Sequence, residues 1–314
     1  MKQLNPFLYS DDNKRYLTWN YYLKHRYQQK VYKVPLNAGF TCPNRDGSAG
    51  YGGCTFCSSS GSGDYAGNVQ DDLLIQFEQG KQMMERKWPG GLAIAYFQAF
   101  TNTYAPLAVL KQLYEPFRYR NDIVAIAIAT RSDCLSEEII NYLASYHQDK
   151  EVWIELGLQS MHDETAMLIN RGHSFANFQF AVKRLRDHGL PVVTHLMNSL
   201  PGETPDMMVE SAKAVAALDI QAVKIHMLHV MKQTAMGKTF ERKPFPLMSK
   251  EAYIETVVSQ LEVLPPAMII QRLTGDAPAD LLLAPEWTRN KTIVLNDIDK
   301  EMVRRNTWQG RLWQ

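Results

Sequence analysis

Short apolar segments alternate with longer amphipathic segments over most of the chain. The apolar segments cover residues 31–36, 92–98, 123–130, 152–158, 191–197 and 222–228. Residues 123–130 read IVAIAIAT, a nearly continuous apolar run of the kind found in strands that are covered on both faces. We therefore predict a β-strand at each of these positions.

The segments between the strands carry start and stop signals of helices. Asp71 precedes an amphipathic run, and Ser136 is followed by two glutamates. Thr204 is followed by Pro205, and Gly189 stands where the preceding helix would end. Alternating strands and helices form right-handed βαβ units with a parallel sheet. The predicted fold class is α/β, a partial (β/α)6 TIM-like barrel.

Both ends of the chain depart from this pattern. Residues 1–30 are rich in Tyr, Trp, Lys and Arg and predict an N-terminal helical extension. After Glu241 the sequence RKPFP breaks the pattern, Ser249 precedes a helical run, and AMIIQRLT is a candidate further strand. We predict a core over 31–240 and a C-terminal extension over 241–314. One large domain with extensions and a two-domain chain both remain open at 314 residues.

Composition is that of a globular protein with a large core, with 45% hydrophobic and 21% charged residues. This excludes disorder, collagen and coiled coil as the main state. The net charge is +1, so any polyanion must be met by a local basic patch. No apolar run approaches the roughly 20 residues that span a bilayer, and the N-terminus lacks a signal peptide. We expect a cytoplasmic protein without a membrane partner.

Three of the four cysteines, Cys42, Cys54 and Cys57, lie on a glycine-rich loop after the first strand, spaced C-x11-C-x2-C. Thiolates suit a soft metal, and iron–sulfur clusters usually take four cysteines, so three would leave one iron open. Structural zinc needs a fourth ligand, for which His25 and Cys134 are the candidates. A redox pair of Cys54 and Cys57 would leave Cys42 unexplained. The spacing favours an open cluster over zinc.

Polar residues stand at the carboxyl ends of the predicted strands, where parallel α/β barrels carry their chemistry. They are Gln98, Thr130, Arg131, Gln159, His195 and His226. We expect them to line one rim together with the cysteine loop. For each one singly, a contact that caps a strand end is the alternative.

These features resemble the radical S-adenosylmethionine (SAM) superfamily, and more closely its YhcC/YtqA-like family, a relative of the Elongator catalytic subunit. The shared segments are VPLNAGFTCPNRDG, GGCTFC, YFQAFTNTYAPL (96–107), ATRSDCL (129–135), ELGLQS (155–160), NRGHS (170–174), HLMNSLPGET (195–204), KIHMLHV (224–230) and RLTGDAP (272–278) with QG (309–310). The long gap after the first cysteine is usual in this family. Ser199 and Ser132 depart from it, since relatives usually have Gly and often Pro there.

The resemblance implies a barrel of radical SAM type and a set of cofactor contacts. Cys42, Cys54 and Cys57 would hold a [4Fe–4S] cluster whose free iron is chelated by SAM. The reduced cluster would cleave SAM to a 5′-deoxyadenosyl radical, which abstracts hydrogen from substrate. The implied SAM contacts are Gln98, in the segment 98–102 that binds the amino group, Thr130, the pair Gln159 and Arg171, and His195 near the ribose or sulfonium. Arg171 would neutralise the carboxylate.

Kinship with the Elongator catalytic subunit implies a tRNA substrate. The implied reaction converts the 5-carboxymethylaminomethyl group of wobble (2-thio)uridine to the 5-aminomethyl group, with flavodoxin or ferredoxin as electron donor. A wobble base lies unstacked in a loop and enters a pocket at low cost. Two alternatives stay open: a radical SAM enzyme acting on a small molecule or protein, and a non-catalytic zinc- or cluster-binding module.

Two segments are candidate tRNA surfaces. Residues 14–33 interleave aromatic and basic side chains, although an amphipathic helix packing its aromatics on the barrel is the favoured interpretation. Arg304, Arg305 and Arg311 form a second basic candidate. Cys134 is expected to be a buried small side chain. His226 and His229 are expected to be packed or substrate-facing, without an assigned role.

Overall fold

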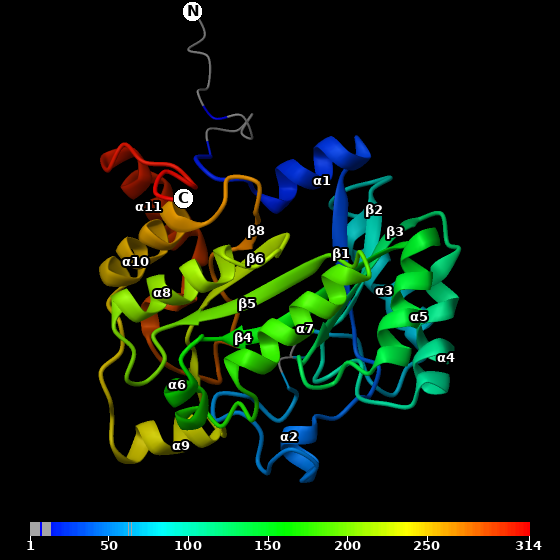
Figure 1. Ribbon diagram of the computed structural model, residues 1–314, viewed down its shortest axis with the longest axis horizontal. Coiled ribbons are helices and arrows are strands. Elements are labelled where there is room, and N and C mark those ends of the chain that lie inside the picture. Colours follow the sequence, from blue (N-terminus) through cyan, green and yellow to red (C-terminus); the bar gives the residue numbers. More distant parts are fainter. Residues whose placement is uncertain (1–6, 8–13, 62, 64) are drawn as a thin grey trace, which may run out of the picture. The chain divides into compact units, whose positions relative to one another are not determined.

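The computed structural model describes residues 7, 14–61, 63 and 65–314, and Figure 1 shows its elements. The strands are β1 (Val31–Leu36), β2 (Leu92–Phe97), β3 (Ile123–Thr130), β4 (Glu151–Gln159), β5 (Val192–Asn198), β6 (Ala222–Met227), β7 (Val230–Met231), β8 (Ile269–Arg272) and β9 (Leu282–Ala284). The helices are α1 (Trp19–Tyr27), α2 (Pro43–Asp46), α3 (Leu73–Glu85), α4 (Leu107–Arg118), α5 (Glu137–Asp149), α6 (Asp163–Leu168), α7 (Phe175–Asp187), α8 (Pro205–Ala216), α9 (Ala235–Arg242), α10 (Lys250–Val263), the 3-10 turn η1 (Glu286–Arg289) and α11 (Lys291–Arg304).

The main sheet has seven strands in the order β1-β2-β3-β4-β5-β6-β8. The pairs β1–β2, β2–β3, β3–β4 and β6–β8 are parallel. All of the predicted strands are present, with bounds that differ by one residue at most. The candidate strand AMIIQRLT is also confirmed, since it contains β8. β7 and β9 form a separate antiparallel pair.

The apolar faces of β2 and two helices make an aromatic core. The Phe97 ring of β2 packs edge-on against Tyr114 and Phe117 of α4, with centroid distances of 4.7 and 5.5 Å. Phe77 of α3 packs against Phe117 at 5.8 Å, and all four rings are fully buried. Burial of each such side chain stabilises the fold by about 1.5–3 kcal/mol. This packing fixes β2, which leads into the segment 98–102.

The predicted helix caps are largely confirmed. The hydroxyls of Ser136, Thr204 and Ser249 accept hydrogen bonds from the backbone N–H groups of the first turns of α5, α8 and α10. One prediction was wrong by a residue. The N-cap of α3 is Asp72, whose carboxylate accepts from the Leu74 N–H at 2.8 Å. Two adjacent aspartates offer the same capping group, and only the geometry of the preceding turn selects between them.

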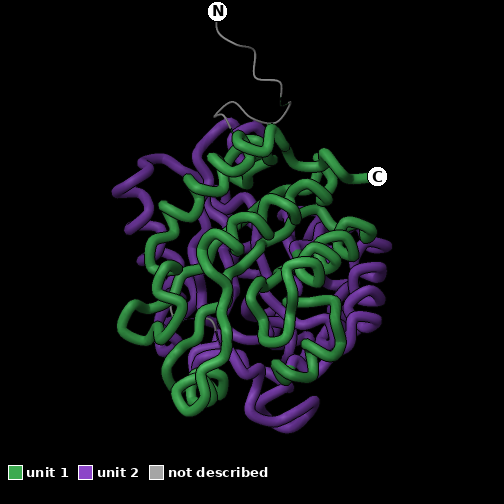
Figure 2. Tube along the Cα trace, turned by 90° about the vertical axis from the view of Figure 1, so that its left-hand side faces the viewer, with its two compact units in different colours: residues 1–22, 158–170, 194–314 green, residues 23–157, 171–193 purple. Residues whose placement is uncertain are grey.

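The described chain forms two compact units, coloured in Figure 2. Unit 1 comprises residues 1–22, 158–170 and 194–314, and unit 2 comprises residues 23–157 and 171–193. Both units are discontinuous in sequence. The chain passes from one to the other within α1, β4 and β5 and between α6 and α7. The predicted division at residues 30 and 240 follows the chain linearly and stays a prediction.

In unit 1, β5 is attached to a helical layer by a buried amide pair. Asn198 of β5 donates to Gln260 of α10 at 2.8 Å, and Gln260 donates back at 2.9 Å. Gln260 also donates to the Met208 carbonyl of α8 at 2.9 Å. Figure 1 shows α8, α10 and α11 following one another as a layer. The face of β5 that carries Asn198 is therefore the helix-covered face.

None of the helices in the described part of the chain is long and apolar enough to cross a membrane.

Candidate functional site

The loop after β1 positions the cysteines in unit 2. Cys42 is the N-cap residue of α2, which begins at Pro43. Gly47 ends this short helix with a φ of 93°, a left-handed conformation that favours glycine. Cys54 and Cys57 share one turn, in which the Cys57 N–H donates to the Cys54 carbonyl at 3.0 Å. The loop thus presents one thiol from a helix start and two from a turn.

Two neighbouring residues of α2 hold the turn in place. The carbonyl of Asn44 accepts the Gly53 N–H at 2.8 Å, and the Asn44 side-chain amide donates to Cys54 Sγ at 3.8 Å. Arg45 donates to the Ser58 carbonyl. Gly53 has a φ of 74°, and an added Cβ would lie 2.9 Å from Arg45 Nε. Glycine is required here because the turn closes directly on α2.

The surroundings favour a thiolate in this loop. A hydrogen bond from Cys57 lowers the pKa of the Cys54 thiol to about 7, and the Arg131 guanidinium and the Asn44 amide act in the same direction. The same pairing raises the pKa of Cys57. A thiolate is the form of cysteine that binds metals.

Two buried arginines stand beside the thiols. Arg131 and Arg171 are 8% and 1% exposed, and both act electrostatically on Cys54. Arg131 makes a two-pronged contact with Asp133 at 2.8 and 2.6 Å and donates to the Arg171 carbonyl at 2.8 Å. Arg171 donates from Nε and Nη2 to the His173 carbonyl at 3.0 and 2.8 Å. Carboxylate and carbonyl contacts therefore fix the positive charges next to sulfur.

Gly172 lets the side chains of Asn44 and Arg131 lie close to its backbone. The ideal Cβ of Gly172, at a φ of 82°, would lie 2.9 Å from Asn44 Oδ1 and 3.4 Å from Arg131 Nη2. Asn44 and Arg131 therefore both pack on the backbone of Gly172. Sequence reasoning placed Arg131 at a strand end but missed its contact with the cysteine loop. That contact joins segments separated by about 80 residues, which no local pattern encodes.

The donor set fits an iron–sulfur cluster. Three partly exposed free thiols lie on one loop, and Thr55 between two of them has a buried hydroxyl without a partner in the described structure. Among the described residues, no three His, Cys, Asp or Glu side chains gather closely enough to hold a single metal ion. A cubane cluster makes no such demand, because each cysteine binds a different iron.

Cys134 is set apart chemically from the loop cysteines. Burial and the neighbouring Asp133 carboxylate raise the pKa of its thiol far above the usual range. A neutral thiol is a poor ligand and nucleophile. Its side chain is half-buried, so the expectation of a buried small side chain is met only in part.

Two predicted SAM contacts of unit 2 lie at strand ends. Gln98 follows β2 directly, and its N–H donates to the Leu36 carbonyl at 3.3 Å. The Thr130 hydroxyl lies 2.5 Å from that of Thr103, so an internal hydrogen bond engages it. Asn102, not singled out by sequence, is fully buried; its amide donates to two backbone carbonyls, and Oδ1 lacks a partner among the described atoms. It is an acceptor within the segment 98–102 expected to bind the amino group.

The other predicted contacts belong to unit 1. Gln159 ends β4 in a left-handed conformation with a φ of 61°. His195 lies within β5, and its ring centroid is 5.3 Å from that of His226. The predicted Gln159–Arg171 pair joins residues of different units, and its role stays a prediction.

The two serines that depart from the family pattern, Ser199 and Ser132, both make hydrogen bonds within the protein. Ser199 has a φ of 73°, a conformation in which glycine is normal, and its hydroxyl accepts from the Met248 N–H at 3.1 Å. Ser132 in unit 2 contacts Asn177 at 2.7 Å and His173 at 3.2 Å. Both hydroxyls therefore serve protein contacts.

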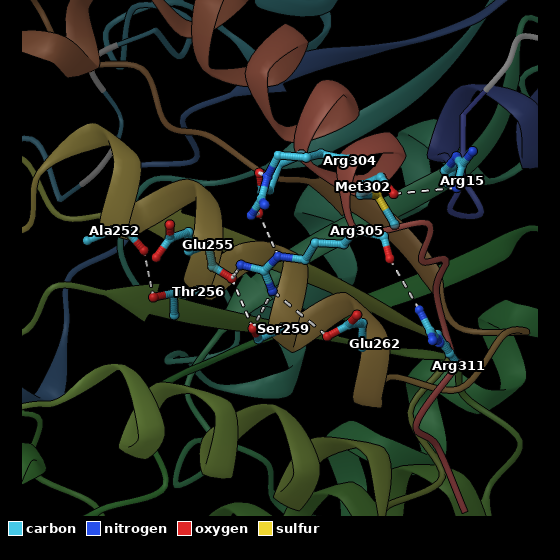
Figure 3. A network of polar contacts seen from close by, with 11 residues as sticks. Arg15, Ala252, Glu255, Thr256, Ser259, Glu262, Met302, Arg304, Arg305 and Arg311 are labelled. Atoms are coloured by element: carbon cyan, nitrogen blue, oxygen red, sulfur yellow. Dashed lines mark hydrogen bonds and ion pairs between the residues drawn. The ribbon is translucent and has the colours of Figure 1, made fainter.

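The predicted basic patch of unit 1 is part of a network of polar contacts, drawn in Figure 3. Arg304 and Arg305 both pair with Glu301 at 2.6 Å, and Arg305 also contacts Glu262 at 4.0 Å. Arg311 donates to backbone carbonyls, including that of Arg305 at 3.3 Å. This surface offers less positive charge than the sequence indicates.

The aromatic and basic segment 14–33 is only partly packed. Tyr16 and Tyr32 are buried, at 5% and 4% exposed, and Trp19 and Tyr22 of α1 are half-buried and stack at 5.5 Å. Arg26 pairs with Glu151 at 3.0 Å. The aromatic side chains of the segment are therefore buried or half-buried, in agreement with the favoured interpretation that they pack on the protein.

The chain is similar to several known proteins. Residues 40–215 match the family "Radical SAM superfamily", and residues 220–304 match the "Radical_SAM C-terminal domain". The chain is 50% identical to the uncharacterized protein YtqA of Bacillus subtilis over 314 residues, which is all of this chain and 98% of that protein. It is 36% identical to YhcC of Escherichia coli over 279 residues, 88% of this chain and 89% of that protein.

A more distant relative is named for a reaction on tRNA. The tRNA uridine(34) acetyltransferase of Methanocaldococcus infernus is 30% identical over 163 residues, 51% of this chain but 30% of that protein. The solved structure of M. infernus Elp3 with an N-terminal deletion superposes with a TM-score of 0.67 at 20% identity. It covers 90% of this chain, which spans 64% of that one. The fold likeness confirms the predicted α/β class and its partial barrel of parallel strands.

Proposed function

Because this chain belongs to the radical SAM superfamily, in the family that includes YtqA and YhcC, we propose that it modifies the wobble uridine of tRNA. As a radical SAM enzyme it uses a [4Fe–4S] cluster and SAM. The family match excludes the non-catalytic zinc module. What supports the tRNA substrate is the relative named for uridine 34, which matches half of the chain.

The chain's own residues would hold and shield these cofactors. Cys42, Cys54 and Cys57 would bind three irons, and Asn44 and Arg131 stabilise the thiolate form at Cys54. Asn102 Oδ1 is an acceptor suited to the SAM ammonium, and Arg171 a donor suited to its carboxylate. When bound, the cofactors supply a carbon-centred radical that takes a hydrogen atom from the substrate. We propose the same role for Gln98, Thr130, Gln159 and His195 as SAM contacts.

The proposed reaction converts the 5-carboxymethylaminomethyl group to the 5-aminomethyl group. Removal of one hydrogen atom, one electron and one proton from the group between nitrogen and the carboxylate, with the hydrogen atom taken from its methylene carbon and the proton from nitrogen, gives an imine. Water then splits the imine into the amine and glyoxylate. The electron carrier, of the flavodoxin or ferredoxin class, recovers the electron that it supplied. Such a reaction on tRNA would place the enzyme in the cytoplasm.

Nucleoside analysis tests the substrate. We expect tRNA from a strain lacking the gene to accumulate 5-carboxymethylaminomethyl (2-thio)uridine and to lose the aminomethyl form. The purified enzyme, reduced anaerobically with SAM, should convert this tRNA and release glyoxylate and 5′-deoxyadenosine in equal amounts. Unchanged wobble nucleosides in the deletion strain would reject the tRNA proposal in favour of a small-molecule or protein substrate.

A further inference from the structure

A group of basic side chains lies on one face of three strands in unit 1. His195 of β5 and His226 of β6 approach each other with ring centroids 5.3 Å apart. Strand side chains alternate, so His195 lies on the face opposite to Asn198, which bonds the helical layer. Arg272, the last residue of β8, acts electrostatically on His226. The three side chains thus share the face that α8 and α10 leave uncovered.

His226 is the unusual member of this group. Its Nε2 atom is buried and has no hydrogen-bond partner in the described part of the chain. Burial, together with the charges of His195 and Arg272, holds the pKa of His226 well below its usual range. The ring is therefore neutral at physiological pH and keeps one N–H donor. Buried polar atoms are nearly always paired, so an unpaired one points to a ligand.

The charge beside His226 is incompletely compensated. Asp276 pairs with both Arg272 and Lys291, so one carboxylate serves two cations. The Arg272 side chain is 37% exposed and keeps donors for a further acceptor. The loop after β8 is fixed against His229, because a Cβ on Gly275 would lie 2.6 Å from that ring. The local net charge therefore attracts an anion.

We propose that His226 and Arg272 bind the carboxylate of the substrate, next to the SAM contact proposed for His195. This inference rests on the proposed function, in which the uridine side chain ends in a carboxymethyl group. A guanidinium and a neutral imidazole N–H are complementary to a carboxylate. A backbone phosphate of tRNA has the same charge, but backbone phosphates stay at the surface whereas the Nε2 atom of the half-buried His226 is shielded from solvent. The buried donor thus favours the end of an inserted base over the backbone.

Binding of matched RNAs tests this assignment. Two anticodon stem-loops would carry either the 5-carboxymethylaminomethyl uridine or its neutral carboxamide analogue, and affinity would be measured by fluorescence anisotropy with the cluster-loaded enzyme. We expect the wild type to prefer the carboxylate by on the order of tenfold, the effect of one charge-assisted hydrogen bond. Arg272→Gln and His226→Asn should bring that ratio close to one, and Arg272→Lys should restore part of it.

A variant that is expected to increase the carboxylate preference distinguishes a binding effect from simple unfolding. Asp276→Asn releases Arg272 from its partner and should raise the carboxylate preference by about threefold, which no loss of structure would do. Arg242→Gln, an exposed arginine of α9, is the matched control and should leave the ratio unchanged.

Each remaining outcome overturns the proposal in a recognisable way. If Arg272→Gln weakens both RNAs equally, the site binds a backbone phosphate. If it weakens SAM binding and leaves the RNA ratio intact, the site serves the cofactor. A ratio unaffected by all variants removes the site, although the wild type still converts tRNA. If the wild type binds and converts neither RNA, the proposed function fails and this inference fails with it.

Discussion

Two pairs of arginines in this chain are put to different uses. Arg131 and Arg171 of unit 2 are almost fully buried and act on Cys54. Arg304 and Arg305 of α11 in unit 1 both form ion pairs with Glu301. Arg131 also has a carboxylate partner, Asp133, yet its charge still reaches the thiols because the pair lies in a poorly screened interior. The number of basic residues in a segment therefore does not tell how much charge is available to a ligand.

The largest expected effect comes from removing a sulfur next to the buried pair. Cys54→Ala should abolish stable cluster assembly, because Cys54 is the ligand whose thiolate the surroundings favour. Anaerobically reconstituted wild type should contain about four irons per chain and absorb in the visible range. Cys134→Ala is the control and should keep its iron. A Cys54→Ala protein with full iron content and colour would contradict the ligand assignment.

A smaller effect is expected from removing the charge while keeping the ligands. Arg131→Gln should retain iron but lower the cluster's reduction potential, because a positive charge beside the thiolates favours the added electron. A shift on the order of 50 mV is expected, since about 59 mV corresponds to a tenfold change for one electron. Redox titration followed by EPR measures it, and Arg131→Lys should recover most of the potential. An unchanged potential would mean that the arginine only supports the fold.

Substitutions of Arg304 and Arg305 should lower stability only slightly, and the effect should be larger at Arg305. Arg305 bonds Glu301 at 2.6 Å and Ser259 at 3.0 Å with its side chain 23% exposed. Arg305→Gln should lower the free energy of unfolding by about 1 kcal/mol. Arg304 is 69% exposed and solvent screens its ion pair, so Arg304→Gln should lower the urea midpoint by less than Arg305→Gln does. Equal effects of the two variants would show that burial does not distinguish them.

The smallest effect concerns acid. The Arg304 hydrogen bond, with help from Arg305, lowers the pKa of Glu301 to about 2 from the usual 4.5. A carboxylate with a lower pKa in the folded state stabilises the fold above pH 4.5, and this stabilisation is lost as the pH falls towards 2. Glu301→Gln should flatten that part of the stability curve, measured by urea unfolding at stepped pH. Glu241→Gln, on an exposed stretch of α9, should leave the slope as in the wild type.

Local signals predicted the elements well. The run IVAIAIAT became β3, and the serine and threonine caps lie where their spacing indicated, because both depend on neighbours within a few residues. Asp71 was predicted as the N-cap of α3 in place of Asp72, because two adjacent aspartates are equally good caps until the conformation of the preceding turn is known. The cysteine loop could also be predicted, because its three cysteines lie within 16 residues of the sequence.

Contacts between distant segments were not predictable in this way. Asn102, His226 and the approach of Arg131 to Cys54 each depend on which strands lie side by side. The basic cluster around Arg304 was overestimated, because Glu301 one turn away cancels it only when the helix places the side chains together.

The sequence by itself determined the parallel α/β elements, the three cysteines on a glycine-rich loop and, through ordered motifs, the family. Only the tertiary structure decided that two guanidiniums act on the thiols, that Glu301 pairs with the outer arginines, and that Nε2 of His226 is buried without a partner among the described residues. The physical reason is range: propensity and spacing act over one or two turns, whereas electrostatics and burial depend on what the fold brings within a few ångströms.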